Sequence, residues 1–221
     1  MTQTQTGADP SARAALEVRR VALKLAAIAQ NGLTYGEGPF DLDRYRQVAG
    51  LAVDLLAVLS GRPAGELALE LGRDTGYATP KVDVRGVVID ERERVLLMRE
   101  RSDGLWSLPG GWADPTDTPS AAVLREIREE TGYGARVLKL AACWDRDTHD
   151  LVPALPVHVY KLFFLCAADG VVGPPDALET LDLGWFDFAA LPPLSLARVN
   201  AAQLARMLHH HRDPVLATDF D

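Results

Sequence analysis

The chain is organised around the stretch GWADPTDTPSAAVLREIREETGY, from Gly111 to Tyr133. This stretch begins as a glycine-rich turn and continues as a helix. Asp117 and Thr118 suit a helix N-cap, and Pro119 suits the first helical turn. Gly132 stands where a left-handed C-cap is expected. The stretch therefore predicts a helix from about Thr118 to Gly132.

This predicted helix carries three acidic residues beside an apolar stripe of Val123, Leu124 and Ile127. At about 100° per residue, Glu126, Glu129 and Glu130 fall within roughly a 100° arc. Clustered carboxylates repel each other unless a cation neutralises them, and oxygen ligands of this type suit Mg²⁺ or Mn²⁺. The alternative is a solvated helix face on which Arg125 and Glu129 form an exposed ion pair.

The same segment resembles the Nudix box, whose pattern is G-x5-E-x7-R-E-U-x-E-E-x-G-U with U an aliphatic residue. The matching positions are Gly111, Arg125, Glu126, Ile127, Glu129, Glu130 and Gly132. Two positions depart from the pattern: Asp117 replaces the first glutamate and Tyr133 replaces an aliphatic residue. In the family that first acid braces the motif arginine, so the shorter aspartate puts the brace to Arg125 in question.

The resemblance implies divalent-metal-dependent hydrolysis of a nucleoside diphosphate linked to another group. By the family's pattern, Glu126 and Glu130 are the principal metal ligands, with Glu129 as a third and the Gly110 carbonyl as a backbone ligand. The expected cofactor is Mg²⁺ or Mn²⁺. Glu129 and Glu130 are expected to be catalytic, and Arg125 is expected to position the carboxylates. Such ions neutralise the pyrophosphate, orient the water and lower its pKa.

The general base is a box glutamate or an acid from a later loop, as in related enzymes. Glu179 is the candidate from such a loop, DALETLDLGW, with Asp182 near it. The competing interpretation makes both residues ordinary surface acids. Geometry decides between these interpretations.

Substrate contacts are expected from aromatic and arginine side chains. Trp106 and Trp112 are candidates for stacking on a base or surrounding a quaternary ammonium group, although each also suits packing in the core. Arg101 and Arg146 are candidates for phosphate binding, because guanidinium groups pair with phosphate through two hydrogen bonds.

Composition narrows the function classes. The 221 residues are 48% hydrophobic and carry 31 acidic against 23 basic residues, for a net charge of −8. This balance argues against general nucleic-acid binding. No apolar run reaches membrane-spanning length, and the N-terminus lacks the order of a signal peptide. Two cysteines, Cys143 and Cys166, make no disulfide framework. A cytoplasmic protein with reduced thiols and no membrane contact is expected.

Four regions are predicted along the chain: a disordered tail (1–10), an N-terminal helical domain (11–73), a linker (74–80) and a Nudix hydrolase domain (81–221). Expected helices are Ala12–Asn31, ended by Asn31-Gly32, then Phe40–Ser60 and Pro63–Leu71. Their apolar surface exceeds what a helical hairpin hides. We expect a homodimer through these helices; the alternative is an extension that covers its own catalytic domain.

The remaining pattern predicts an α/β fold. Strands are expected at 81–90, 95–99, 106–108, 135–144, 157–167 and 183–188, with a last helix at 200–211. This order fits a mixed-sheet α/β/α sandwich preceded by a small all-α module. The segments IAQNGLTY (28–35), YATPKVDVRG (77–86), SDGLWSLPGGW (102–112) and HVYKLFFLC (158–166) are similar to the Nudix subfamily with an N-terminal helical domain.

That subfamily is associated with ADP-ribose and CDP-choline pyrophosphatases, so a small nucleotide derivative of this class is the expected substrate. Two alternatives remain open. One is processing of RNA ends or caps by the same metal site, for which the three arginines Arg99, Arg101 and Arg146 would supply local basic charge. The other is a non-catalytic nucleotide sensor, which usually lacks the box glutamates that this chain retains.

Overall fold

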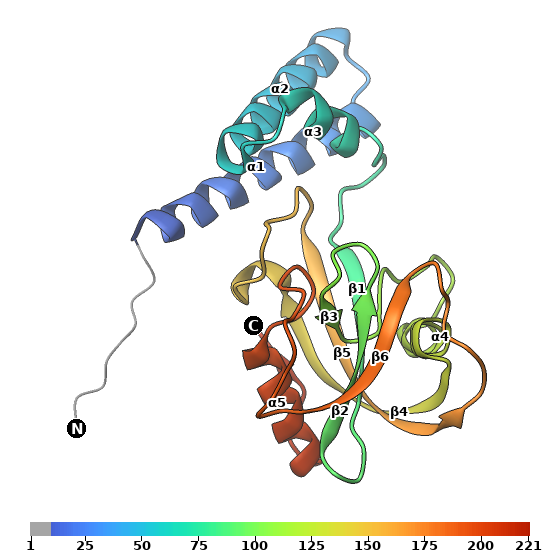
Figure 1. Ribbon diagram of the computed structural model, residues 1–221. Helices are drawn as coiled ribbons and strands as arrows, with labels where there is room; N and C mark the ends of the chain where they lie inside the picture. Colours follow the sequence, from blue (N-terminus) through green and yellow to red (C-terminus); the bar gives the residue numbers. More distant parts are fainter. Residues whose placement is uncertain (1–9) are drawn as a thin grey trace. The chain divides into compact units, whose positions relative to one another are not determined.

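The computed structural model describes residues 10–221, which divide into two compact units (Figure 1). The first unit contains the residues up to Pro80 together with Leu155–His158, and the second contains Lys81–Ala154 and Val159–Asp221. The predicted tail lies outside the described residues, apart from Pro10, which begins the first helix. Among the described helices, none combines the length and the apolar character needed to cross a membrane.

Three helices form the first unit: α1 (Pro10–Tyr35), α2 (Pro39–Ser60) and α3 (Ala64–Leu71). Their shared core is made of Ala22, Val53, Leu56 and Leu67. The prediction that Asn31-Gly32 ends the first helix is wrong, because α1 continues to Tyr35. A Cβ on Gly32 would lie 2.4 Å from the Tyr45 ring, so the glycine lets α2 pack closely against α1. The Asn31 side chain instead accepts a hydrogen bond from the N–H of Ala78 at 2.7 Å.

Two sheets form the second unit. The four-stranded sheet has the order β1 (Lys81–Val88), β5 (Val159–Val171), β4 (Tyr133–Asp145) and β7 (Asp219–Phe220). The three-stranded sheet has the order β3 (Trp106–Ser107), β2 (Arg94–Glu100) and β6 (Thr180–Asp187). Strand β1 runs parallel to β5, whereas β4 runs antiparallel to it, which confirms the predicted mixed sheet.

Helices α4 (Pro119–Thr131) and α5 (Ala201–Arg212) lie on opposite sides of the sheets (Figure 1). Consecutive strand residues alternate between the two resulting cores, because side chains on a strand point to opposite faces. Val88 and Leu96 pack in the core that contains Ile127 of α4. Val87 and Leu97 pack in the core that contains Leu204 and Met207 of α5. The α/β architecture with preceding helices is thus confirmed.

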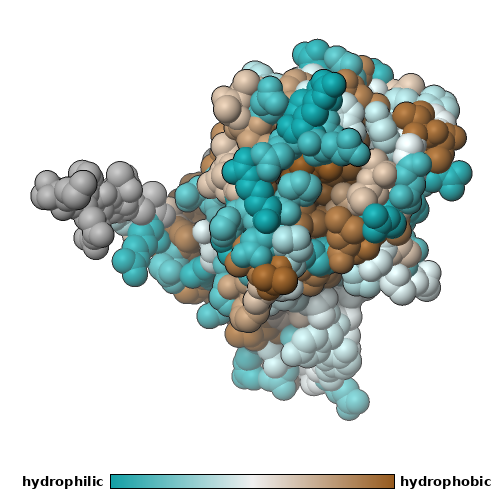
Figure 2. Space-filling model, turned by 90° about the horizontal axis from the view of Figure 1, so that it is seen from below, coloured by the Kyte–Doolittle hydropathy of each residue, from teal (hydrophilic) through white to brown (hydrophobic). Residues whose placement is uncertain are grey.

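Strand β7 was not predicted. It has only two residues, which pair with Ala142 and Cys143 of β4, so it is too short to show an alternating pattern in the sequence. Both cysteines, Cys143 and Cys166, are free thiols. On the molecular face in Figure 2, hydrophobic residues occur in patches separated by hydrophilic ones.

Candidate active site

The central helix α4 begins and ends as the sequence predicts. The Thr118 hydroxyl accepts a hydrogen bond from the N–H of Ala121 at 3.2 Å, and Pro119 occupies the first turn. Gly132 ends the helix with φ +71°, the left-handed conformation that glycine adopts without steric cost. On its inner face Ile127 is fully buried and packs so closely on Gly86 that a Cβ there would lie 2.6 Å away. This packing fixes the rotation of α4 about its axis.

This rotation of α4 buries two box glutamates, so that little of either side chain is accessible to solvent. Glu130 is 5% exposed and Glu126 is 8% exposed. Burial raises the pKa of Glu130 to about 8, although the N–H of Gly110 and the charge of Arg85 oppose that rise. Burial also raises the pKa of Glu126, with Arg125 acting in the opposite direction. Two carboxylates one helical turn apart are therefore held where a positive charge would be strongly favoured.

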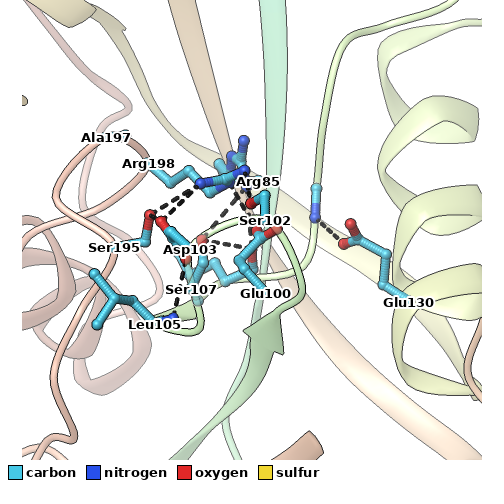
Figure 3. A network of polar contacts seen from close by, with 12 residues as sticks. Arg85, Glu100, Ser102, Asp103, Leu105, Ser107, Glu130, Ser195, Ala197 and Arg198 are labelled. Carbon is cyan, nitrogen blue, oxygen red and sulfur yellow. Dashed lines mark hydrogen bonds and ion pairs between the residues drawn. The ribbon is translucent and has the colours of Figure 1, made fainter. Parts of the chain in front are cut away.

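Gly110 contacts Glu130 directly. Its N–H donates a hydrogen bond of 2.7 Å to Glu130 Oε2 (Figure 3). Its φ is +143°, and a Cβ on this residue would lie 2.0 Å from the carbonyl oxygen of Val84. The turn runs along β1 through hydrogen bonds of 2.8 Å from Val84 N–H to the Gly111 carbonyl and from Gly86 N–H to the Pro109 carbonyl. Only glycine fits position 110, and strand β1 sets where it lies.

Arg125 connects the acids of the box. Its Nε lies 3.2 Å from Asp117 Oδ2, so the shorter aspartate still braces the arginine. Its Nη1 lies 2.9 Å from Glu126 Oε1 and 3.2 Å from Glu129 Oε2. Asp114, which the sequence analysis did not single out, lies 3.2 Å from Nη2. The guanidinium is thus surrounded by four carboxylates, and its role in positioning them stays a prediction.

The second departure from the box pattern, Tyr133, also has a structural explanation. Its ring packs edge-on against Trp185 with centroids 5.9 Å apart. The Trp185 indole N–H donates to the Tyr133 hydroxyl at 3.4 Å. An aromatic residue in place of the aliphatic one therefore has a partner in β6.

The loop before β6 docks onto the end of α4. The N–H of Asp176 donates to the Glu129 carbonyl at 2.7 Å, and the Thr180 hydroxyl donates to the Glu130 carbonyl at 2.8 Å. Glu179 lies exposed in this loop, and its carbonyl accepts from the N–H of Arg101 at 2.9 Å. The structure therefore brings the candidate base Glu179 to the same region as the box. Its role as the base stays a prediction.

The two candidate phosphate-binding arginines have partners within the chain. Arg101 is exposed, and its guanidinium donates to the Ala177 carbonyl at 2.7 and 3.1 Å. Arg146 begins the short 3-10 helix Arg146–Thr148 and is 2% exposed. It donates to the Pro153 carbonyl at 2.6 Å and to the Ala197 carbonyl at 3.3 Å. Both contacts with substrate stay predictions, and the burial of Arg146 gives it a clear structural role.

The two candidate tryptophans differ in exposure. Trp106 packs edge-on against Phe186, with centroids 4.6 Å apart, beside the core under α5. Trp112 is 50% exposed and pairs with Asp83 across an isolated β-bridge. Trp112 is therefore the one whose ring surface is open to a ligand.

Sequence reasoning missed a buried charged cluster beside the box. Asp83, Arg85 and Lys161 are 6%, 4% and 1% exposed. Arg85 Nη2 lies 2.7 Å from Asp83 Oδ2, and Lys161 Nζ lies 2.6 Å from Asp83 Oδ1. The signal was present: charges at alternate positions of the valine-rich KVDVRGVV share one strand face, and buried charges are rare unless paired.

A second ion pair, also missed, joins the buried Glu100 to the partly exposed Arg198. Glu100 is 7% exposed and pairs with Arg198 Nε at 2.8 Å. Arg198 also reaches Asp103 at 3.2 Å and the Ser102 hydroxyl at 3.0 Å (Figure 3). Burial raises the pKa of Glu100, and Glu179 adds to that rise while Arg198 opposes it. The β2–β3 loop is thus tied to the segment before α5.

The donor set fits a divalent cation of the Mg²⁺ type, because it consists of carboxylate and backbone oxygens. The two buried glutamates also bear a desolvation cost that a cation would relieve. Within residues 10–221, no three Asp, Glu, His or Cys side chains already converge as a ligand set. Glu129, whose side chain is 53% exposed, is instead engaged with Arg125. The structure therefore holds two of the predicted carboxylate ligands in place and leaves the third at the surface.

Comparison with known proteins identifies the family. The NUDIX domain model matches residues 79–208, and a UDP-X-like N-terminal oligomerisation domain matches residues 17–69. The chain is 37% identical over 201 residues to "Putative ADP-ribose pyrophosphatase YjhB" of Bacillus subtilis (strain 168), covering 90% of this chain and 95% of that protein.

Two solved structures of related enzymes support the same family assignment. An ADP-ribose pyrophosphatase from Streptococcus suis 89-1591 has 37% identity and a TM-score of 0.58, covering 65% of this chain and all of that one. A UDP-X diphosphatase has 30% identity and a TM-score of 0.58, covering 94% and 99% of the two chains. The chain thus belongs to the Nudix hydrolase family and is a pyrophosphohydrolase of nucleoside-diphosphate derivatives with an N-terminal domain of the UDP-X-like type.

Proposed function

We propose that this enzyme hydrolyses the pyrophosphate of ADP-ribose to AMP and ribose phosphate, using Mg²⁺ or Mn²⁺. The observation that carries the reaction type is the pair of buried glutamates, Glu126 and Glu130, set on α4 against the Gly110 turn. The choice of ADP-ribose is supported by the Bacillus subtilis and Streptococcus suis proteins named above. UDP-linked compounds and CDP-choline are the competitors to be tested.

In this proposal Glu126, Glu130 and the Gly110 carbonyl would hold the metal, and Glu129 is the third carboxylate candidate. A divalent ion held there would supply charge neutralisation of the pyrophosphate and a lower pKa for the attacking water. Arg125 keeps Glu126 and Glu129 turned toward the site through contacts of 2.9 and 3.2 Å. The hydrogen bond from Gly110 keeps the Glu130 carboxylate in one orientation.

Two surface residues complete the proposal. Glu179 accepts the proton of the attacking water, which is supported by the docking of its loop on the carbonyl ends of Glu129 and Glu130. Trp112 stacks on the nucleobase, which is supported by its half-exposed ring. Stacking of a base on an aromatic ring is worth about 1–3 kcal/mol.

The N-terminal domain belongs to a type described as an oligomerisation domain, so the chain forms an oligomer. We further propose that this oligomer is a homodimer through α1 and α2. Val21 and Ile28 of α1 are 52% and 56% exposed, and they lie seven residues apart on one helix face. Leu51 and Val58 of α2 are 61% and 84% exposed, with the same spacing. Apolar stripes of this kind favour burial against a second copy.

The test is a product-resolved assay of wild type with Mg²⁺ and with Mn²⁺. Its substrates are ADP-ribose, a UDP-sugar, CDP-choline, nucleoside triphosphates and a short RNA. Glu130→Gln is the active-site variant, and Glu91→Gln, at an exposed turn glutamate, is the matched control. The expected result is AMP from ADP-ribose in wild type and Glu91→Gln, with loss in Glu130→Gln.

Three outcomes would contradict the proposal in different ways. Preferred cleavage of the UDP-sugar or CDP-choline would change the substrate but keep the reaction. Shortening of the RNA alone would favour end processing. Binding of a nucleotide, seen as a raised melting temperature, with no turnover of any substrate would make the site a sensor.

A further inference from the structure

Arg85 is a buried arginine of β1, and the role assigned to it rests on the proposed role of Glu130 as a metal ligand. The Arg85 guanidinium binds Asp83 through two hydrogen bonds, from Nε to Oδ1 at 2.8 Å and from Nη2 to Oδ2 at 2.7 Å. Such paired hydrogen bonds fix the plane of the guanidinium as well as its position.

The fixed guanidinium has one remaining nitrogen directed at the glycine turn. Arg85 Nη1 donates to the Leu108 carbonyl at 3.2 Å and reaches the Ser107 hydroxyl at 3.5 Å. Leu108 stands two residues before Gly110, whose N–H holds the Glu130 carboxylate. A chain of direct contacts therefore leads from Asp83 through Arg85 and the turn to Glu130.

Asp83 is itself anchored from the neighbouring strand. Lys161 is its direct partner in the parallel register of β1 and β5, and the two side chains meet at 2.6 Å. The cluster contains two cations and one carboxylate, so it carries a net positive charge beside the buried Glu130 and Glu126. Arg85 is the member of this cluster that contacts the turn whose Gly110 N–H holds Glu130.

We propose that Arg85 is a positioning residue for the hydrolytic site: anchored by Asp83 and Lys161, it fixes the Leu108–Gly110 turn and thereby the orientation of the Glu130 carboxylate. Lysine does not replace arginine in this role, because an ammonium cannot bind Asp83 through two hydrogen bonds and reach Leu108 at the same time. Arg85 touches neither substrate nor the reacting atoms in this assignment.

The experiment compares Arg85→Lys with wild type, Glu130→Gln and the control Arg94→Lys. Arg94 also forms a paired contact with an aspartate, Asp90, at 2.9 and 2.7 Å, but in the β1–β2 turn. The readouts are Mn²⁺ affinity measured by electron paramagnetic resonance without substrate, kcat and KM for the substrate that wild type cleaves, and the melting temperature. Arg85→Lys is expected to lose about 10–100-fold in Mn²⁺ affinity and kcat, as outer-shell changes typically do. KM should stay near that of Arg94→Lys, whereas the melting temperature should fall below it, because lysine leaves buried polar groups without their partners.

The outcomes separate this inference from the proposed function. If Glu130→Gln binds Mn²⁺ as wild type does, the ligand assignment fails. If Glu130→Gln loses Mn²⁺ but Arg85→Lys matches Arg94→Lys in affinity and kcat, the positioning role is overturned. If Arg85→Lys does not fold, Lys161→Gln leaves Arg85 in place and weakens only its anchor. This variant should then show weaker Mn²⁺ binding and lower kcat, and wild-type values for both would overturn the proposal.

Discussion

The Glu130 carboxylate accepts a 2.7 Å hydrogen bond from the N–H of Gly110, twenty residues earlier in the chain. This contact joins the glycine turn to helix α4 at a site where the carboxylate is 5% exposed. Burial holds its pKa at about 8, so the ionised form is costly without a cation. The ionised carboxylate that metal binding requires should therefore lower the stability of the metal-free protein.

The first prediction concerns Glu130. Glu130→Gln should reduce kcat by at least about 100-fold, because it removes a metal-binding charge.

In EDTA, Glu130→Gln should gain stability relative to wild type as pH rises from 5 to 8. A folded-state pKa raised above the unfolded value means that the folded carboxyl keeps its proton while the unfolded one ionises, so wild-type stability falls across this window. The gain should reach about 2–4 kcal/mol at pH 8. Urea titrations at both pH values measure it, and a difference independent of pH would contradict the explanation.

The second prediction concerns Gly110. Gly110→Ala should lower the free energy of unfolding by about 3 kcal/mol or more, because the new Cβ would lie 2.0 Å from the Val84 carbonyl. Gly104→Ala is the control: its φ is +71°, but the nearest atom to a Cβ there is 3.9 Å away. It should lose only about 1–2 kcal/mol. Denaturant titration of the two variants distinguishes a steric clash from backbone strain alone. If both variants lost the same free energy of unfolding, the clash with Val84 would contribute nothing to stability.

The third prediction concerns the brace on Arg125. Asp117→Asn should lower kcat by only about threefold, because Asp114, Glu126 and Glu129 still surround the guanidinium. Asp114→Asn with Asp117→Asn should lower kcat by more than the product of the single effects. A double-mutant cycle on kcat measures this coupling. Strictly additive single effects would show that the two aspartates act independently.

The fourth prediction concerns pH and the C-terminal strand. Arg206 and His210 hold the pKa of Asp219 at about 2, below its usual 3.8. A depressed carboxyl pKa stabilises the fold above pH 4 and loses that effect as pH falls toward 2. Asp219→Asn should therefore cost about 1 kcal/mol at pH 7, after allowance for solvent screening, and less near pH 2. Asp169→Asn, which breaks an exposed 3.7 Å pair with Arg136, should change little at either pH. A cost at pH 2 as large as that at pH 7 would rule out the ion pairs as its source.

The fifth prediction tests the homodimer. Val21→Glu combined with Leu51→Glu should convert the oligomer to monomer, because both side chains are more than half exposed on α1 and α2. Light scattering after size exclusion gives the mass directly. Val215→Glu, at a 90% exposed valine outside the helical unit, should leave the mass unchanged. A double variant that keeps the wild-type mass would place the interface elsewhere.

Local features of this protein follow from short stretches of its sequence. The caps at Thr118 and Gly132, the apolar face of α4 and the mixed order of strands and helices depend on neighbouring residues, and each could be read from periodicity and capping chemistry. The resemblance to the Nudix box, rather than periodicity, singled out Glu126 and Glu130 as ligand candidates. Asn31-Gly32 failed as a helix stop because tertiary packing against Tyr45, rather than local preference, decides the role of Gly32.

Contacts between residues far apart in the sequence depend on how the whole chain folds. Lys161 meets Asp83 only because β1 and β5 pair in parallel register. The two strands are neighbours in the sheet, although β2, β3, α4 and β4 lie between them in the sequence. The Arg85 contact with the Leu108 carbonyl and the Glu100 pair with Arg198 likewise bring together segments far apart in the sequence. Such contacts follow from strand register and burial of the whole chain, which no local pattern encodes. Two of these residues, Arg85 and Glu100, are among the charges that act on the buried Glu130.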